Sequence, residues 1–341
     1  MKTYLVTGGA GFIGSNFIKY LIKTQKHISI VNVDKLTYAG NLENLKEIEN
    51  HPCYCFIQGD ICDPLFIGKI FDEKEIDYVV NFAAESHVDR SIQNPMIFAQ
   101  TNVLGTLNLL NHTKAAWETE TGFKAGRKFI QISTDEVYGS LGNTGYFTEN
   151  SPLDPHSPYA SSKASGDLMV KAYYDTYQMP INITRCSNNY GPYQFPEKLI
   201  PLMIDRCFHK KPLPLYGDGL NIRDWLYVED HCKAIAAVIE RGKQGEVYNI
   251  GGNNEKTNQH IVKTIIDYIH KHIDPSVTES LITYVADRKG HDRRYAIDPS
   301  KIKNELGWEP EISFEEGIIK TIEWYLQHQD WIKQVQGGGH E

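Results

Sequence analysis

The chain has 341 residues, of which 41% are hydrophobic and 23% are charged, and its formal net charge at pH 7 is -8. This length predicts about two domains and this composition predicts a large globular core, which excludes a lone small module and a disordered or fibrous chain. An acidic chain without a basic block is not typical of a protein that binds nucleic acid or anionic membranes.

Neither membrane insertion nor secretion is expected. No apolar run approaches the roughly 20 residues of a membrane helix, and the apolar start of the chain reaches Gly8 too early for a signal peptide. We therefore expect a soluble, cytoplasmic protein. The cysteines at 53, 55, 62, 186, 207 and 232 form no C-x-x-C pair and have no histidine partner at zinc-finger spacing, so no metal site is expected.

Short β-rich runs alternate with stretches of helical length along the first half of the chain. The expected strands are residues 4–7, 28–33, 54–58, 78–82, 129–132 and 181–184. Nearly continuous apolar strands separated by helix-length segments predict a parallel sheet that is covered on both faces. Asp63 before Pro64 marks one helix start between the strands, with Asp as the cap and Pro in the first turn. The predicted fold is therefore α/β, with a doubly wound parallel sheet.

The rhythm changes after about residue 186, where prolines at 192, 196, 201, 212 and 214 break the chain into loops and short helices. This predicts a smaller, partly interwoven C-terminal α/β domain. The expected boundaries are 1–185 for the first domain, 186–330 for the second and 331–341 for a tail, with 337–341 disordered. Residues 247–250 resemble another buried strand after an apolar helix, so the segment from about 228 to 252 is expected to pack back onto the first domain.

A glycine-rich turn follows the first strand. Residues 8–14, Gly-Gly-Ala-Gly-Phe-Ile-Gly, fit the dinucleotide fingerprint, in which glycines allow a tight turn, close approach of a pyrophosphate and close packing of the following helix. Taken alone, the same letters also fit an ordinary turn. Asp34 ends the second strand about 20 residues further on, where a carboxylate binds the ribose hydroxyls and repels a 2'-phosphate. The combination predicts a dinucleotide site that prefers NAD over NADP.

Two further strand ends have open interpretations. Asp60 and Ile61 follow the third strand, where they could contact an adenine ring or simply begin a helix. Ala83 and Ala84 follow the fourth strand, where small side chains suit either a passing cofactor or tight packing.

Tyr159 and Lys163 are one helical turn apart, so they share a helix face. A nearby ammonium group favours the phenolate and lowers the pKa of a tyrosine, which gives a base for the hydroxyl of a sugar or alcohol as hydride leaves. A Tyr and a Lys on an exposed helix are the commoner meaning of such a pair. The dinucleotide fingerprint upstream makes the catalytic interpretation the preferred one.

Residues 133–139, Ser-Thr-Asp-Glu-Val-Tyr-Gly, follow the fifth strand at the carboxyl edge of the predicted sheet, where ligands of such folds bind. Adjacent carboxylates on a loop usually face solvent. Beside a site of hydride transfer, Asp135 and Glu136 could instead serve as the acid and base of an elimination, and Thr134 could bridge a substrate hydroxyl to Tyr159.

Residues 8–14, the pair Tyr159 and Lys163, and residues 188–192 together resemble the extended short-chain dehydrogenase/reductase family, whose members modify nucleotide sugars. Within it, residues 34–41, 133–139, 216–219 with 223–225, and 287–298 are similar to the branch that dehydrates dTDP-glucose. The resemblance extends to about residue 325. Lys289 departs from it, because the family more often has Pro there.

The resemblance implies a redox-neutral reaction with NAD, in which C4 of the glucose ring is oxidised, water leaves across C5 and C6, and the hydride returns at C6. The product is a 4-keto-6-deoxy sugar nucleotide for deoxysugar synthesis of the rhamnose type. The implied catalytic roles are C5 deprotonation by Glu136, protonation of the C6 hydroxyl by Asp135, and initiation by Tyr159 with Lys163, assisted by Thr134. A homodimer formed through helices near 97–117 and 159–178 is also implied.

The resemblance further implies the ligand contacts. The cofactor side comprises Gly8, Gly11, Phe12, Ile13, Gly14, Asp34, Lys35, Thr37, Asp60, Ile61, Ala83, Ala84, Ser86, Thr101, Tyr159, Lys163 and Asn189. The substrate side comprises Ser86, Thr134, Asn188, Lys198, Leu199, Pro214, Tyr216, Arg223, Asn258, Arg288 and His291. Arg223 and Arg288 are the natural partners of the pyrophosphate, because a guanidinium binds phosphate oxygens in a bidentate fork.

Two alternatives stay open. A nucleotide-sugar 4-epimerase or decarboxylase shares the glycines, Tyr159 and Lys163 but does not need Asp135 and Glu136. A non-catalytic NAD-binding sensor would be free to lose the Tyr and Lys pair, which this chain keeps.

Overall fold

Seven parallel strands form the central sheet in the computed structural model, which describes residues 1–337. Their order is β12-β8-β7-β4-β1-β2-β3, and every neighbouring pair is parallel. The strands are β1 (Lys2–Thr7), β2 (Ile28–Asp34), β3 (Tyr54–Gln58), β4 (Tyr78–Asn81), β7 (Lys128–Thr134), β8 (Ile181–Cys186) and β12 (Val247–Ile250). The predicted doubly wound parallel sheet is confirmed.

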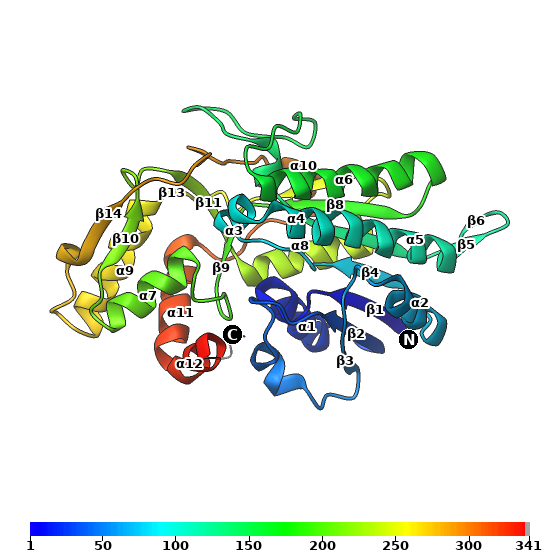
Figure 1. The fold of residues 1–341 in the computed structure, drawn as a ribbon, viewed down its shortest axis with the longest axis horizontal. Helices are drawn as coiled ribbons and strands as arrows, with labels where there is room; N and C mark the ends of the chain where they lie inside the picture. The colour runs from blue at the N-terminus through cyan, green and yellow to red at the C-terminus, as the bar shows by residue number, and fades with distance from the viewer. Residues whose placement is uncertain (338–341) are drawn as a thin grey trace.

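Helices cover both faces of this sheet. Tyr4 and Val6 of β1 belong to one apolar core and Leu5 to another, as expected for side chains that alternate along a strand. The first core contains α1 (Phe12–Thr24) and α8 (Val228–Arg241), whereas the second contains α2 (Pro64–Glu73), α5 (Thr106–Trp117) and α6 (Pro158–Tyr177). In Figure 1, α6 lies beside β8 in the upper part of the sheet, and α1 lies beside β1 and β2 in the lower part.

The chain between β4 and α5 is not one regular helix. The expected helix at 97–117 is divided into α4 (Pro95–Phe98), a π-helical turn η2 (Ala99–Gly105) and α5, with α3 (Val88–Gln93) before them. π-helical turns are rare in proteins as a whole, and those that occur often lie at functional sites. Short elements elsewhere are η1 (Leu42–Ile48), β5 (Glu118–Thr119), β6 (Gly122–Phe123), η3 (Asp135–Tyr138) and η4 (Glu279–Leu281).

A second group of elements follows β8 and has its own core, which includes Ile204, Ile265 and Ile322. Its strands are β9 (Asn188–Tyr190), β11 (Ile222–Tyr227) and β13 (Glu255–Thr257) in one sheet, and β10 (Leu213–Tyr216) with β14 (Ile282–Val285) in another. Its helices are α7 (Leu199–Phe208), α9 (Asn258–His272), α11 (Phe314–Gln327) and α12 (Gln329–Gly337). These elements gather at the left of Figure 1.

The two groups are interwoven along the chain. β12 pairs with β8, and α8 places Ile235 in the first core. The helix α10 (Ser300–Leu306) also returns to that core, through Ile302 and Leu306, although the sequence analysis assigned it to the second domain. Because Ile302 and Leu306 are four residues apart on a helix, they share one apolar face.

The expected tail at 331–341 is wrong for residues 331–337, which belong to α12. Trp331 is buried, and its indole N–H donates to the Asn44 side-chain oxygen at 3.0 Å, so the helix is fixed to η1. The expectation of disorder over 338–341 lies outside the described residues. None of the helices formed by residues 1–337 has the length and apolar content that a membrane span requires.

Candidate active site

The glycine-rich turn lies between β1 and β4, where the strand order reverses and where open α/β sheets bind their ligands. Gly8 has φ +71°, and a Cβ on it would lie 2.5 Å from the Ala83 amide nitrogen. A Cβ on Gly14 would lie 2.5 Å from the Gly8 carbonyl oxygen. The N-cap of α1 is Gly11, which has no capping side chain, so the first-turn N–H groups suit a pyrophosphate.

Asp34 ends β2 and is buried beside this turn. Its carboxylate accepts hydrogen bonds from the Ala10 amide at 2.9 Å and the Leu36 amide at 2.8 Å. Burial raises the pKa of Asp34, and the two amide donors oppose the shift. Beside it, the Lys35 ammonium lies 2.7 Å from the Asp60 carboxylate, which neutralises the nearest cation. A fixed carboxylate next to a neutralised cation favours ribose hydroxyls over a 2'-phosphate.

The purified protein should therefore bind NAD more tightly than NADP. Asp34→Ala should narrow the preference, and Asp34→Asn, which keeps the shape of the side chain but removes its charge, should narrow it as well. Titration of both cofactors measures the ratio of the two dissociation constants, and an equal or reversed preference in the unaltered protein would refute the assignment.

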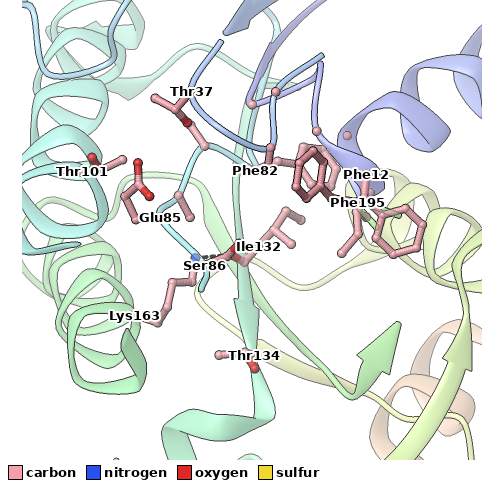
Figure 2. Close-up of a pocket in the computed structure, with 18 of the residues that line it drawn as sticks. Phe12, Thr37, Phe82, Glu85, Ser86, Thr101, Ile132, Thr134, Lys163 and Phe195 are labelled. Carbon is pink, nitrogen blue, oxygen red and sulfur yellow. Dashed lines mark hydrogen bonds between the residues drawn. The ribbon is translucent and has the colours of Figure 1, made fainter. Parts of the chain in front are cut away.

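A cavity of 330 Å³ extends from the glycine turn to the start of α6, and every residue expected to contact the cofactor lines it. Figure 2 shows the rings of Phe12, Phe82 and Phe195 together on one side of it, with Glu85 and Thr101 on the other. One apolar wall and one polar wall suit a ligand with both aromatic rings and ribose hydroxyls. The glycine cradle, Asp34 and this cavity together fit NAD.

Tyr159 and Lys163 lie in the first turns of α6, which is capped by the Ser157 hydroxyl, an acceptor of the Ala160 N–H at 3.1 Å. Tyr159 is 9% exposed and Lys163 is 4% exposed, which excludes the alternative of an exposed helix face. The Lys163 ammonium donates to the Ile132 carbonyl at the end of β7 at 2.7 Å, the dashed contact in Figure 2. This bond fixes α6 against β7, the strand that directly precedes Asp135 and Glu136.

The expected lowering of the Tyr159 pKa is wrong for this structure. Burial raises the pKa of Tyr159 well above its usual value, and the charge of Glu136 raises it further, whereas a hydrogen bond with the Thr134 hydroxyl opposes the shift. Burial also lowers the pKa of Lys163, the cation expected to favour the phenolate. Desolvation is the largest cause of the pKa shift of each group.

Asp135 and Glu136 form the first turn of η3, directly after β7. Asp135 is 2% exposed, so the solvent-facing alternative is excluded. The Thr134 hydroxyl caps the turn, since it accepts the Glu136 N–H at 3.2 Å. Burial raises the pKa of Asp135 well above its usual value, and the charge of Glu136 adds to the shift. The shift favours the protonated form of Asp135, which is the form that a general acid needs.

A second cavity of 320 Å³ adjoins the first, and every expected substrate residue except Thr134 lines it. Thr134 lines the first cavity. Glu136, Asn188 and Lys198 line both, whereas Tyr159 and Lys163 line only the first. The elimination base is thus placed where the cofactor cavity meets the substrate cavity.

The Arg223 guanidinium already has several partners within the protein, so it is less available to a ligand than the sequence suggested. It donates to the main-chain oxygens of Ile222 at 2.8 Å and Asp292 at 3.0 Å, and it lies 4.2 Å from the ring centroid of Tyr295. Its charge opposes the raised pKa values of both Asp135 and Glu136. Arg223 therefore also acts on the carboxylate pair, in addition to its expected role at the pyrophosphate.

Several site residues escaped the sequence analysis. Glu85 is buried in the cofactor cavity, and the Asn102 side chain in η2 holds its main chain through bonds of 2.9 and 3.0 Å. Tyr38 lines the same cavity and belongs to residues 34–41, which the sequence had singled out as a motif, whereas Phe195 comes from a distant loop and belongs to no motif.

Asn189, which the sequence did predict, lines both cavities, but its carboxamide is already bonded to His231 and to the Ser187 carbonyl.

Residues 5–321 match the GDP-mannose 4,6-dehydratase family. The chain is 52% identical to a dTDP-glucose 4,6-dehydratase of Xanthomonas campestris pv. campestris over 345 residues, which cover 100% of this chain and 97% of that protein. It is 50% identical to a dTDP-glucose 4,6-dehydratase of Escherichia coli over 349 residues, which cover 99% of this chain and 96% of the other.

Solved structures give the same relationship. A dTDP-glucose 4,6-dehydratase from Bacillus anthracis in complex with NAD has a TM-score of 0.89 and 50% identity, and the match covers 98% of this chain and 100% of that one. A UDP-glucose 4-epimerase from Thermotoga maritima has a TM-score of 0.85 but only 30% identity, over 96% of this chain and 99% of the epimerase. The fold is common to both activities, whereas the sequence is nearer to the dehydratase.

Proposed function

This chain belongs to the GDP-mannose 4,6-dehydratase family, and on that premise we propose that it is an NAD-dependent hydro-lyase that dehydrates dTDP-glucose to the 4-keto-6-deoxy sugar nucleotide. The observation that carries the proposal is the placement of Asp135 and Glu136. Asp135 is buried and lines the cavity that Tyr159 and Lys163 also line, and Glu136 lines both cavities. When bound, NAD supplies the acceptor that takes hydrogen from C4 and returns it at C6.

Tyr159 takes the proton of the C4 hydroxyl. Its raised pKa makes a phenolate costly in the structure, so the positive charge of Lys163 on the same helix face is needed to stabilise it. Thr134 lines the same cavity as Tyr159 and connects the phenol to the substrate hydroxyl. These roles follow from the placement of the groups on α6 and at the end of β7.

Glu136 and Asp135 carry out the elimination. A ketone at C4 acidifies the C5 proton, which Glu136 removes, while Asp135 donates its proton to the departing C6 hydroxyl. Burial raises the pKa of Glu136 as well, but the charges of Arg223, Lys198 and Arg288 oppose this shift. The two neighbouring carboxyl groups thus differ in their charged neighbours, which favours Asp135 as the proton donor and Glu136 as the proton acceptor.

The alternatives of an epimerase, a decarboxylase and a binding sensor are less well supported. An epimerase or decarboxylase has no need of the adjacent Asp135 and Glu136 in the cavity, and a sensor has no need of the buried Tyr and Lys pair. Mass spectrometry after incubation with dTDP-glucose tests the proposal. We expect loss of one water without net change in the redox state of nicotinamide, whereas an unchanged mass would refute dehydration.

We also propose a role in deoxysugar synthesis of the rhamnose type and a homodimeric assembly. Three large apolar side chains that line neither cavity are exposed on neighbouring elements: Met96 is 72% exposed, Leu104 57% and Leu168 60%. They lie on α4, η2 and α6, which contact one another. A cytoplasmic location and the division into residues 1–185 and 186–330 stay predictions.

Leu168→Glu should convert the dimer to a monomer, because a charge would be buried in the apolar contact between subunits. Analytical ultracentrifugation of the unaltered protein should give twice the chain mass of 38.9 kDa. Leu65→Glu on α2, an exposed leucine elsewhere on the surface, is the matched control and should leave the mass unchanged. A monomeric unaltered protein would contradict the proposed dimer.

A further inference from the structure

A salt bridge joins two walls of the substrate cavity. Asp89 belongs to α3 of the first group of elements, and Arg288 follows β14 in the second group. The Arg288 Nη2 donates to the Asp89 Oδ2 at 2.8 Å, and Nε lies 2.6 Å from Oδ1 as an ion contact rather than an aligned hydrogen bond. Both side chains line the cavity expected to hold the nucleotide sugar.

The geometry of the guanidinium leaves one of its edges available. Nε and Nη2 form the edge that faces Asp89, whereas Nη1 and Nη2 form a second edge that can hold another anion. Within residues 1–337, no hydrogen bond involves Nη1 of Arg288. The guanidinium carbon also lies 5.3 Å from the ring centroid of Tyr216, so an aromatic face restrains it as well.

A carboxylate beside a diphosphate site could act in two ways. It could compete with the diphosphate for the arginine, or it could hold the arginine in place for the diphosphate. The second is favoured because Asp89 uses the Nε edge and leaves the Nη1 edge free. An arginine that a salt bridge already orders also loses less side-chain entropy when it binds an anion than an arginine that moves freely.

We propose that Asp89 is a positioning residue, which fixes the guanidinium of Arg288 across the cavity so that its second edge binds the diphosphate of the nucleotide sugar. This inference rests on the proposed function. It assigns a role in substrate binding to a carboxylate that repels the substrate by charge alone, and it connects the helix after β4 to the phosphate site of the second group of elements.

Asp89→Asn keeps the shape of the side chain and removes its charge. Calorimetric titration of the NAD-loaded enzyme should show dTDP binding weakened on the order of 10-fold, within the range of couplings between contacting residues. The KM for dTDP-glucose should rise similarly with little change in kcat. Thymidine has no phosphate, so its binding should not change. Asp218→Asn is the control, because it removes the exposed carboxylate that binds both terminal nitrogens of Arg293, a neighbour of Arg288 in the chain. It should change the binding of neither dTDP nor thymidine.

A double-mutant cycle separates positioning from a general loss of structure. Arg288→Lys keeps the charge but cannot use two edges, so it should weaken dTDP binding, and Asp89→Asn should then add little further loss. Equal or tighter binding of dTDP by Asp89→Asn, fully additive losses, or an equal loss for thymidine would each overturn the proposal. If the unaltered enzyme does not bind dTDP, the proposed function fails instead.

Discussion

Tyr159→Phe should lower turnover about 100- to 10,000-fold, the usual loss when a general base is removed, while dTDP-glucose still binds. Only the phenolic oxygen is lost, and the ring keeps its buried place on α6. Because burial raises the pKa of Tyr159, the phenolate forms more readily as pH rises, so turnover of the unaltered enzyme should increase with pH on its acid side. Steady-state kinetics with binding measured separately checks both statements.

Tyr177→Phe provides the matched control, because Tyr177 is an exposed phenol at the end of the same helix. It should leave turnover unchanged. If a correctly folded Tyr159→Phe variant keeps near-normal turnover, the base that takes the C4 hydroxyl proton is another residue.

The sequence could predict the sheet because each strand is a short apolar run. The ends of the observed strands differ only slightly from the predicted ends. It could also predict the glycine cradle and Asp34, since both are tied to fixed places in a strand-turn-helix unit. The sequence predicted one continuous helix at 97–117, because no residue pattern in this stretch indicates a π-helical turn. The sequence did not predict that α10 packs against the first domain, because an apolar helix face does not indicate which of two cores will bury Ile302 and Leu306.

The electrostatics of the site were the least predictable part. Spacing alone suggested that Lys163 would lower the pKa of Tyr159, but spacing carries no information on burial. Asp135 and Glu136 are adjacent in sequence, and only the fold shows that their surroundings differ. Asp89 carried no motif at all, and its salt bridge to Arg288 joins residues 199 positions apart.

Glu136→Gln should stall the reaction after oxidation at C4. The amide cannot accept the C5 proton, whereas Tyr159 and Lys163 are unchanged, so the first step still proceeds. In single-turnover mixtures, the absorbance of reduced nicotinamide should rise on the order of one equivalent per active site, provided that the keto sugar stays bound. Glu149→Gln is the control, because Glu149 is another carboxyl whose pKa is raised by burial, but it lines neither cavity. The Glu149→Gln variant should convert dTDP-glucose to product without accumulating reduced nicotinamide.

The fate of hydrogen in heavy water distinguishes dehydration from epimerisation in the unaltered enzyme. The carboxyl of Glu136 exchanges its proton with solvent, so the 4-keto-6-deoxy product should carry deuterium at C5. The hydrogen that reaches C6 should come from C4 and remain protium, because it is transferred within the site. Finding only the C4 epimer would show that Asp135 and Glu136 do not eliminate water. Finding solvent deuterium at C6 in place of the transferred hydrogen would show that the return step does not conserve the hydrogen removed from C4.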